Sequence, residues 1–496
     1  PQEVELVGDT STYGAIEVSS GADGSEIHNV AMRGLGIGVV VWGSHDVSID
    51  GVWIHDTEDA GVFSAPVMGP TSLTLARSLI ERARYGGIYG WAIEMDVRST
   101  VLRDMRPWTD GLYGNGIAIF EPQNAGEETI ARIADTLVER TREVGIYVQG
   151  ASAIIERSVV RDTAADGNGQ FGRGVTFYDG ADGRPSNGAI VESTLERNQD
   201  LGVVVGASQA RIDAVTLHDT TLGSDTMAGL GILVHSGASR ATAEITRSLL
   251  DANTSVGVFV DFGDAVMEGL WVRNMQPNPN GYGYGVIVQS DPVTGGASHA
   301  DIRYSVVEGC HELGVAYVGS DGLIEASVVR DVVPGNRGYG VGLGVQYAVY
   351  RPEIPTWATA TVKGTLIEGS TQVGVHVIAD VRMERCLIRE TRADASGLYG
   401  DGVSIESYGR ESSLELIGTR IERNARAGLS VFGAAASLDT NAFVCNGFDL
   451  HAGAFKGSEE RLEDLGGNGC GCSEPDAACK AVSAGLTPPE PLEPLQ

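Results

Sequence analysis

Aromatic residues recur at two positions of a repeated short segment, where their side chains could stack on sugar rings. The segment begins with a glycine and an aliphatic residue, as in "GIYVQG" from Gly145 and "GVFVDF" from Gly257. Residues in this segment alternate with a period of two, which predicts a β-strand. The second and fourth residues after the glycine then point away from the core. Such an outward strip suits sugar stacking or contact with a protein partner, unless the long loops fold over it and bury the rings. The predicted ligand-binding residues are Phe63, Tyr89, Trp91, Phe120, Tyr147, Tyr178 and Phe259.

Acidic residues on the same strands are the candidates for hydrolysis, because a glycosidase needs two carboxyl groups roughly 5–9.5 Å apart. The outward acids on these strands are Asp261 and Glu406, five repeats apart and too distant to cooperate. Glu121 and Asp179, just past a strand, remain open alternatives, whereas His376 lies singly on its strand. We therefore assign no catalytic residue from the sequence and lean against an enzyme.

The long loops between repeats combine glycine, an aromatic residue and Asp or Asn, as in "TDGLYGNG" and "ASGLYGDG". Their carboxylates and main-chain carbonyls could surround Ca²⁺, although no EF-hand or nonapeptide calcium motif is present. Turn chemistry with one aromatic anchor per loop explains the same residues and is favoured. The sequence therefore requires no cofactor, leaves Ca²⁺ open and identifies no metal ligand.

The elements that would position these residues form a repeat along nearly the whole chain. The glycine and its aliphatic neighbour recur from Gly36 to Gly428 at a mean spacing of 28 residues. A second pair of short strands follows each of them, as in "AIIERSVVRD" from Ala153. Three short strands per repeat of this length predict a parallel β-solenoid.

Charged residues mark one position of this repeat and alternate in sign. Stacked parallel strands place equivalent residues side by side, so a column of alternating charge brings opposite charges into contact. A shift of the pairing by one coil would place like charges beside one another and is therefore disfavoured. We interpret the column as a structural charge ladder. Its members are His55, Glu81, Arg103, Glu139, Arg161, Glu196, His218, Asp251, Arg273, Glu308, Arg330, Glu368, Arg389 and Glu422.

Loop length alternates together with charge. Six residues separate each acidic ladder residue from the next repeat glycine, whereas ten to thirteen follow each basic one after His55. A folded loop is wider than the ~4.8 Å rise of one coil. Short and long coils therefore alternate so that neighbouring loops do not collide.

This repeat pattern resembles that of the right-handed parallel β-helix superfamily, the pectin-lyase-like fold, over about residues 15–450. The resemblance implies an all-β solenoid of about 15 coils, with ligand grooves along the glycine-led strand and its flanking loops. No specific enzyme family is matched, since the basic signatures of the lyases and the Asp-Asp and Gly-His-Gly runs of polygalacturonases are absent.

Four cysteines close to the C-terminus are the disulfide candidates: Cys445, Cys470, Cys472 and Cys479. Their clustering predicts a disulfide-linked C-terminal cap in an oxidising compartment, with the pairing left open. We divide the chain into a parallel β-helix (1–455), a Cys-containing cap (456–487) and a stiff Pro-rich tail (488–496), which we expect to be disordered.

A net charge of −31 makes nucleic acid an unlikely partner, because acidic surfaces repel phosphate backbones. No apolar run is long enough to span a membrane. The first hypothesis is a secreted or cell-surface adhesive rod of bacterial origin that binds a glycan or protein. The second is a polysaccharide lyase or glycoside hydrolase acting on a neutral or Ca²⁺-bridged polymer, with the insertion between Gly340 and Glu368 as its candidate region. The third is a filament subunit that self-assembles through the solenoid ends.

Overall fold

The computed structural model describes residues 4–8, 13–65, 71–91, 93–121, 128–223, 229–336, 338–349, 355–472 and 479–492. The chain divides into two compact units, an N-terminal unit (Pro1–Leu249) and a C-terminal unit (Leu250–Gln496). The described residues contain β-strands and no helix. This part of the chain therefore has no helix that is long and apolar enough to cross a membrane. Each unit is described by itself below.

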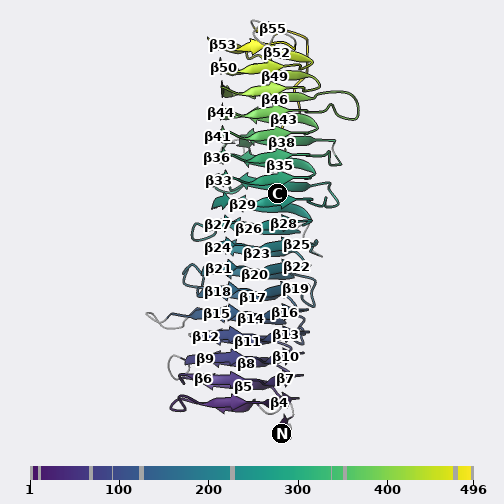
Figure 1. Ribbon diagram of the computed structural model, residues 1–496. Helices are drawn as coiled ribbons and strands as arrows, with labels where there is room; N and C mark the ends of the chain where they lie inside the picture. The colour runs from purple at the N-terminus through teal and green to yellow at the C-terminus, as the bar shows by residue number, and fades with distance from the viewer. Residues whose placement is uncertain are drawn as a thin grey trace. The chain divides into compact units, whose positions relative to one another are not determined.

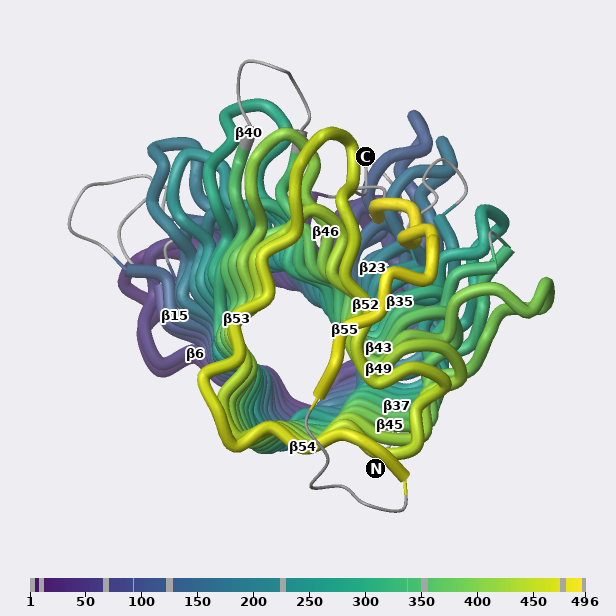
Figure 2. The backbone as a smooth tube through the Cα atoms, turned by 90° about the horizontal axis from the view of Figure 1, so that it is seen from above, coloured from purple at the N-terminus to yellow at the C-terminus, as the bar shows by residue number. Residues whose placement is uncertain are grey.

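Each coil of the N-terminal unit contributes one strand to each of three parallel sheets, which surround a single interior (Figures 1 and 2). We call the sheet of three-residue charged strands sheet A, the glycine-led sheet B, and the third sheet C. Sheet B carries the predicted site. Its strands in this unit are β2 (Gly14–Val18), β5 (Ile37–Trp42), β8 (Ala60–Ala65), β11 (Gly86–Trp91), β14 (Asn115–Phe120), β17 (Val144–Gln149), β20 (Arg173–Tyr178), β23 (Leu201–Gly206) and β26 (Leu230–His235).

The C-terminal unit repeats this arrangement. Inward residues of both units, such as Ile146 and Val315, are fully buried, so stacked aliphatic side chains fill the interior. The right-handed parallel β-helix predicted from the sequence is confirmed. Sheet B of this unit comprises β29 (Ser255–Asp261), β32 (Gly283–Gln289), β35 (Glu312–Val318), β38 (Gly340–Gln346), β43 (Gln372–Ile378), β46 (Asp401–Glu406), β49 (Ala427–Phe432), β52 (Phe448–Gly453) and β55 (Ala481–Val482).

The repeat glycine sits where sheet B approaches sheet A across the interior. At Gly314 a Cβ would lie 2.5 Å from the carbonyl oxygen of Gly342 and 2.6 Å from Val329 Cγ1, so no side chain fits. Two assignments from the sequence were wrong: Gly38 and Gly342 occupy this position, not Gly36 and Gly340. In both places two Gly-aliphatic pairs stand two residues apart, and a period of two cannot tell them apart.

The charged column lies at the last residue of the short sheet A strands. In the N-terminal unit these include β7 (Trp53–His55), β10 (Leu79–Glu81), β13 (Val101–Arg103), β16 (Leu137–Glu139), β19 (Val159–Arg161), β22 (Thr194–Glu196) and β25 (Thr216–His218). Opposite charges are direct register partners here, as in Glu81 with Arg103 and Glu139 with Arg161. Ion pairs of 2.8 Å and 2.6 Å join these partners.

The same alternation occupies sheet A of the C-terminal unit. Glu308 pairs with Arg330, and Glu368 pairs with Arg389 at 2.6 Å. The ladder strands that follow Asp251 are β31 (Trp271–Arg273), β34 (Val306–Glu308), β37 (Val328–Arg330), β42 (Leu366–Glu368), β45 (Leu387–Arg389) and β48 (Arg420–Glu422).

These ion pairs predict that acid unfolds the protein. Asp56, the residue after His55, pairs with Arg82 beside the column at 2.9 Å, and this arginine lowers the pKa of Asp56 to about 2. Burial raises the pKa of Glu81, but hydrogen bonds from Arg103 and Arg82 outweigh it and lower that pKa. Carboxylates with a lowered folded-state pKa stabilise the fold above their unfolded pKa, and this contribution is lost as pH falls through the folded value. We expect the free energy of unfolding, measured by urea titration, to fall steeply between about pH 5 and about pH 2.

An Asp56→Asn variant is the control. It should be less stable than wild type at pH 7 and show a shallower acid dependence. A free energy of unfolding that stays flat from pH 5 to pH 2 would contradict this role for the column.

The C-terminal cysteines form two disulfides, Cys445–Cys472 and Cys470–Cys479, which resolves the pairing. The segment expected as a cap supplies a further strand to each sheet: β53 (Arg461–Gly466), β54 (Gly469–Cys470) and β55. Cys445–Cys472 therefore fastens the last coil to the one before it, whereas Cys470–Cys479 links two points of the last coil. Both disulfides indicate an extracytoplasmic location.

Candidate functional site

A continuous run of aromatic rings follows the outer face of sheet B in the N-terminal unit. Neighbouring ring centroids lie between 4.4 and 6.5 Å apart, and Trp91 and Phe120 are stacked at 4.4 Å. Tyr13 is exposed and the other rings are half-buried, so part of each ring remains accessible to solvent. We call this set the aromatic run; it comprises Tyr13, Trp42, Phe63, Trp91, Phe120, Tyr147 and Tyr178.

Small residues in the same register columns make room for these rings. Ala65 is the register partner of Trp42, and Ala118 is the partner of Tyr147. Gly206 is the partner of Tyr178, whose ring covers it so closely that a Cβ there would overlap the ring. The rings occupy two register columns, and Trp91 and Phe120 follow one another in the same column. Trp42, Tyr147 and Tyr178 each lie beside a small residue on an adjacent coil.

The structure differs from the sequence-based expectation at two of the predicted rings. Tyr89 is only 1% exposed, because Tyr85 packs against it at 4.3 Å and Asn115 donates a hydrogen bond to its hydroxyl. The loop rings of Trp108 and Tyr113 in turn pack on Tyr85, so loop coverage does occur at this point. Phe259 is half-buried but belongs to the C-terminal unit, outside the run.

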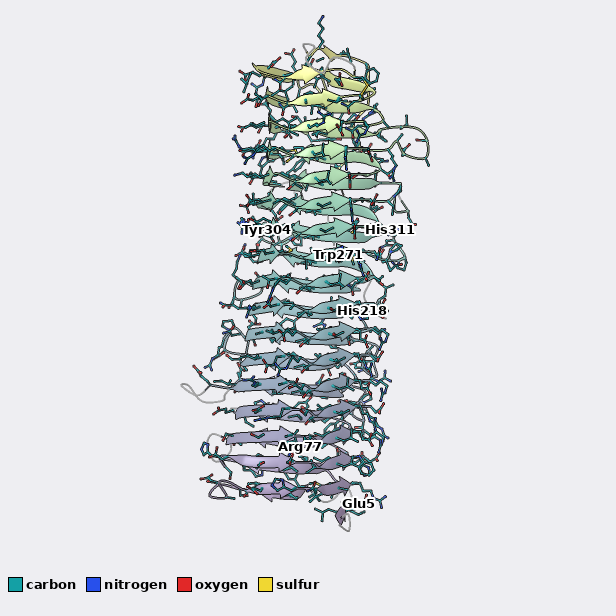
Figure 3. All side chains as sticks on the ribbon, viewed as in Figure 1. Glu5, Arg77, His218, Trp271, Tyr304 and His311 are labelled. Atoms are coloured by element: carbon teal, nitrogen blue, oxygen red, sulfur yellow. A yellow bond between two sulfur atoms is a disulfide. The ribbon has the colours of Figure 1, made fainter. Side chains whose placement is uncertain are left out.

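Other exposed aromatic residues do not join the run. Trp271 and Tyr304 are 41% and 61% exposed and lie elsewhere on the C-terminal unit (Figure 3). Trp53 of the N-terminal unit is on sheet A and stacks on His55. The clustering of rings on sheet B is therefore specific to one face.

Ionisable groups gather at the Tyr178 end of the run. Burial raises the pKa of Glu143, and the nearby Asp166 carboxylate raises it further. Among the described residues, Glu143 Oε2 and Asp166 Oδ2 are buried without a hydrogen-bond partner. Arg173 pairs with buried Asp200 at 3.3 Å and donates to the Tyr178 hydroxyl at 3.3 Å. We call Glu143, Asp166, Arg173 and Asp200 the acidic cluster; a raised pKa and a fixed cation are features of general acid–base sites.

A second perturbed carboxyl lies at the other end of the run. Burial raises the pKa of Asp59 to about 6. Asp59 and Glu143 both stand two residues before a repeat glycine, and three coils separate them. At ~4.8 Å per coil they are about 14 Å apart, beyond the separation at which two carboxyl groups act on one glycosidic bond.

The C-terminal unit brings together two residues that the sequence left apart. His376 Nε2 and Glu406 Oε1 form a buried hydrogen bond of 2.9 Å, with Ser404 beside them. Their side chains are at most 1% exposed. The sequence does not predict this pair, because a diagonal contact between coils of unequal length has no fixed sequence spacing.

The insertion after Gly340 forms a short antiparallel pair, β39 (Ala348–Val349) with β40 (Pro355–Thr356). Tyr347 and Trp357 stack at 5.7 Å, and Trp357 donates a hydrogen bond to Asp380. Arg410 covers the Trp357 ring at 3.9 Å. Tyr350 lies outside the described residues. The polar and aromatic groups that are described here hold the insertion against the coils.

The long loops use their Asp and Asn residues for turns. Asp166 Oδ1 accepts hydrogen bonds from the main-chain N–H groups of Asn168 and Gln170, and Asp394 Oδ1 does the same for Ser396 and Leu398. Within the described ranges, no group of three or more His, Cys, Asp or Glu side chains is arranged to hold a metal ion.

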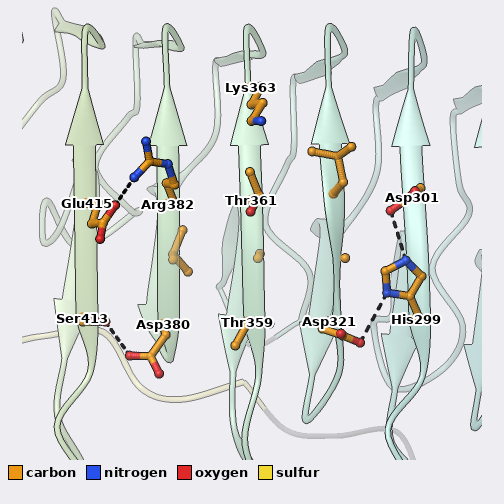
Figure 4. Close-up of a pocket in the computed structure, with 14 residues that line it drawn as sticks. His299, Asp301, Asp321, Thr359, Thr361, Lys363, Asp380, Arg382, Ser413 and Glu415 are labelled. Atoms are coloured by element: carbon orange, nitrogen blue, oxygen red, sulfur yellow. Dashed lines mark hydrogen bonds and ion pairs between the residues drawn. The ribbon is translucent and has the colours of Figure 1, made fainter.

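A shallow polar depression lies on sheet C of the C-terminal unit (Figure 4). It crosses β33 (His299–Arg303), β36 (Asp321–Glu325), β41 (Thr359–Lys363), β44 (Asp380–Glu384) and β47 (Ser413–Ile417). Most of its charged groups pair with one another: His299 lies between Asp301 and Asp321, and Arg382 contacts Glu415. These pairs leave little unsatisfied charge to recognise a ligand.

No family model matches the chain, and no curated protein matches it. Among solved structures, the periplasmic alginate epimerase AlgG is 11% identical, covering 79% of this chain and 77% of that chain with a TM-score of 0.40. The Vag8–C1 inhibitor complex is 11% identical, covering 97% and 99% with a TM-score of 0.45. A PL6 alginate lyase in complex with a trisaccharide is 11% identical, covering 98% and 97% with a TM-score of 0.34. Its own three parallel sheets place the chain among right-handed parallel β-helix proteins.

Proposed function

We propose that this protein is a secreted or cell-surface protein of bacterial origin that binds a neutral polysaccharide along the aromatic run. The observation that carries the proposal is the uninterrupted series of half-buried rings from Trp42 to Tyr178. Aromatic faces stack on the apolar faces of sugar rings, and rings fixed by neighbouring coils lose little conformational entropy on binding.

The charge of the chain favours a neutral glycan over an anionic one. The net charge is −31, so polyuronic acids and sulfated polymers would be repelled. The run follows the direction in which the coils stack, with one ring in most coils. This arrangement suits an extended polymer that makes repeated, similar contacts, as expected of an adhesive protein.

A glycan-array screen of the purified chain tests the proposal. Wild type should bind a neutral polysaccharide with and without Ca²⁺, and Trp91→Ala/Tyr147→Ala should bind at least about tenfold more weakly. Trp53→Ala is the matched control, because it removes an exposed aromatic side chain from sheet A of the same unit. Equal losses in both variants, or no binding of neutral glycans by a folded wild type, would contradict the proposal.

Polysaccharide cleavage is the second candidate function, favoured by the acidic cluster. Glu143, whose pKa is raised above its usual range by burial, would supply a proton, while Arg173 would stabilise developing negative charge. Released reducing ends or unsaturated products in the same wells would support it, provided that Glu143→Gln abolishes them while binding persists. Binding without product would leave the adhesive function alone.

A further inference from the structure

The last described residues of the chain lie on the outer face of sheet B in the C-terminal unit. From Leu486 to Leu492 the chain has no regular secondary structure and runs outside the ring of strands (Figure 2). Its start contacts Arg426, the residue before β49, and its end contacts Gln346, the last residue of β38. We call Thr487–Leu492 the tail segment. It includes 488–492, the described part of the Pro-rich tail.

One side chain holds the main chain of the tail segment at two points. Gln346 Nε2 donates to the Leu492 carbonyl at 2.5 Å, and Leu492 N–H donates to Gln346 Oε1 at 2.7 Å. Gln346 is 4% exposed with the tail segment in place, so its amide and the Leu492 main chain form these hydrogen bonds away from water. A side-chain amide that satisfies both groups of one residue imitates the pairing of a β-strand, which is a common way to bind an extended peptide.

A buried ion pair holds the other end. Arg426 Nη1 donates to the Thr487 carbonyl at 3.0 Å. Its remaining nitrogens bind both oxygens of Asp401, whose side chain is fully buried, and its guanidinium lies 5.1 Å from the Tyr399 ring. Asp401 and Tyr399 therefore orient Arg426, leaving its Nη1 to donate to the peptide carbonyl.

Side chains of the tail segment also occupy defined places. Pro489 is buried, and Leu492 sits over Gly344, where a Cβ would overlap it. Glu490 is exposed, but its carboxylate lies close enough to Tyr408 to raise that residue's pKa, after the larger effects of burial and of Glu406. The tail segment thus spans from β49 to β38, on the face that includes His376 and Glu406.

We propose that the C-terminal unit carries a recognition site for an extended proline-rich peptide, and that the chain's own tail segment occupies this site in cis. Proline favours the extended polyproline II conformation before binding, so little entropy is lost when the peptide docks. Gln346 and Arg426 form hydrogen bonds with main-chain groups of the peptide. The space above Gly344 accommodates a leucine side chain of the peptide.

Peptide exchange on the full-length chain tests the inference. A chain carrying Pro489→Gly/Leu492→Asp should leave the site free, because its own tail can no longer fit. We call this variant the vacant-site chain. We expect it to bind a labelled peptide Gly485–Leu492, amidated at its C-terminus, as measured by fluorescence anisotropy. Wild type should bind this peptide at least about tenfold more weakly, because its tethered tail competes at a high effective concentration.

Matched substitutions in the vacant-site chain locate the binding. Adding Gln346→Ala should weaken peptide binding about tenfold, since two hydrogen bonds are lost. Adding Gln289→Ala, the same residue type at the equivalent position two coils away, should not. Gly344→Val should also weaken binding by filling the place of Leu492.

Two results would overturn the inference. One is failure of the folded vacant-site chain to bind the peptide, and the other is equal binding with and without the Gln346 amide. A wild-type dimer that becomes monomeric on Gln346→Ala, detected by sedimentation velocity, would overturn occupancy in cis, because the tail would then come from a second copy.

Discussion

Replacing Asp401 with alanine is expected to destabilise the C-terminal unit by about 3–5 kcal/mol. Asp401 is fully buried and binds Arg426, whose side chain is only 12% exposed. Without its partner the guanidinium would remain buried and uncompensated. The carboxylate also accepts the main-chain N–H of Ala427, so a hydrogen bond at the start of β49 would be lost. The free energy of unfolding from urea titration measures the effect.

Glu390→Ala is the matched control for this prediction. Glu390 pairs with Arg423 at 3.1 Å, but both side chains are about half exposed, so the loss should be at most about 1 kcal/mol. Similar losses in the two variants would show that burial does not set the strength of these ion pairs. Asp401→Ala should also free the tail segment, which limited proteolysis after Leu486 would detect.

Replacing Gly314 with alanine should cost about 2–3 kcal/mol, a large effect for a single methyl group. The new Cβ would press on the Gly342 carbonyl oxygen and on Val329 Cγ1, and neither main chain nor packed core can move freely. The clash would also disturb the pairing of β35 with β38. Thermal unfolding should show a clear decrease in Tm.

Gly453→Ala provides the comparison. A Cβ at Gly453 has its nearest neighbour 3.7 Å away, on His451, so the substitution should change the stability by no more than about 0.5 kcal/mol. If Gly314→Ala proved equally harmless, the close approach of sheets A and B would not explain the repeated glycine.

The fold could be predicted from the sequence because each coil repeats the same physical constraints. Glycine is required where two sheets approach closely, as at Gly314, and aliphatic residues must alternate along each strand. In-register stacking then brings Glu81 beside Arg103 directly, as the alternation of charge indicates. The run from Phe63 to Tyr178 follows from the same register.

Features that depend on loops or on contacts between unlike segments could not be predicted. Tyr89 has the sequence position of an outward ring but is covered by Tyr85, whose place is set by a loop. His376 and Glu406 meet diagonally across coils of different length. The tail segment reaches Gln346 across 146 residues of sequence, and no periodic pattern marks that contact.

The most direct test of the central claim is the affinity of the chain for oligosaccharides of increasing length, taken from the neutral glycan that binds best on the array. Isothermal titration calorimetry with wild type and Trp91→Ala would supply the values. If the aromatic run is the binding surface, wild-type affinity should rise with oligosaccharide length until the rings are spanned, and Trp91→Ala should reduce the gain for long oligomers. Affinity independent of length and unchanged by Trp91→Ala would contradict it.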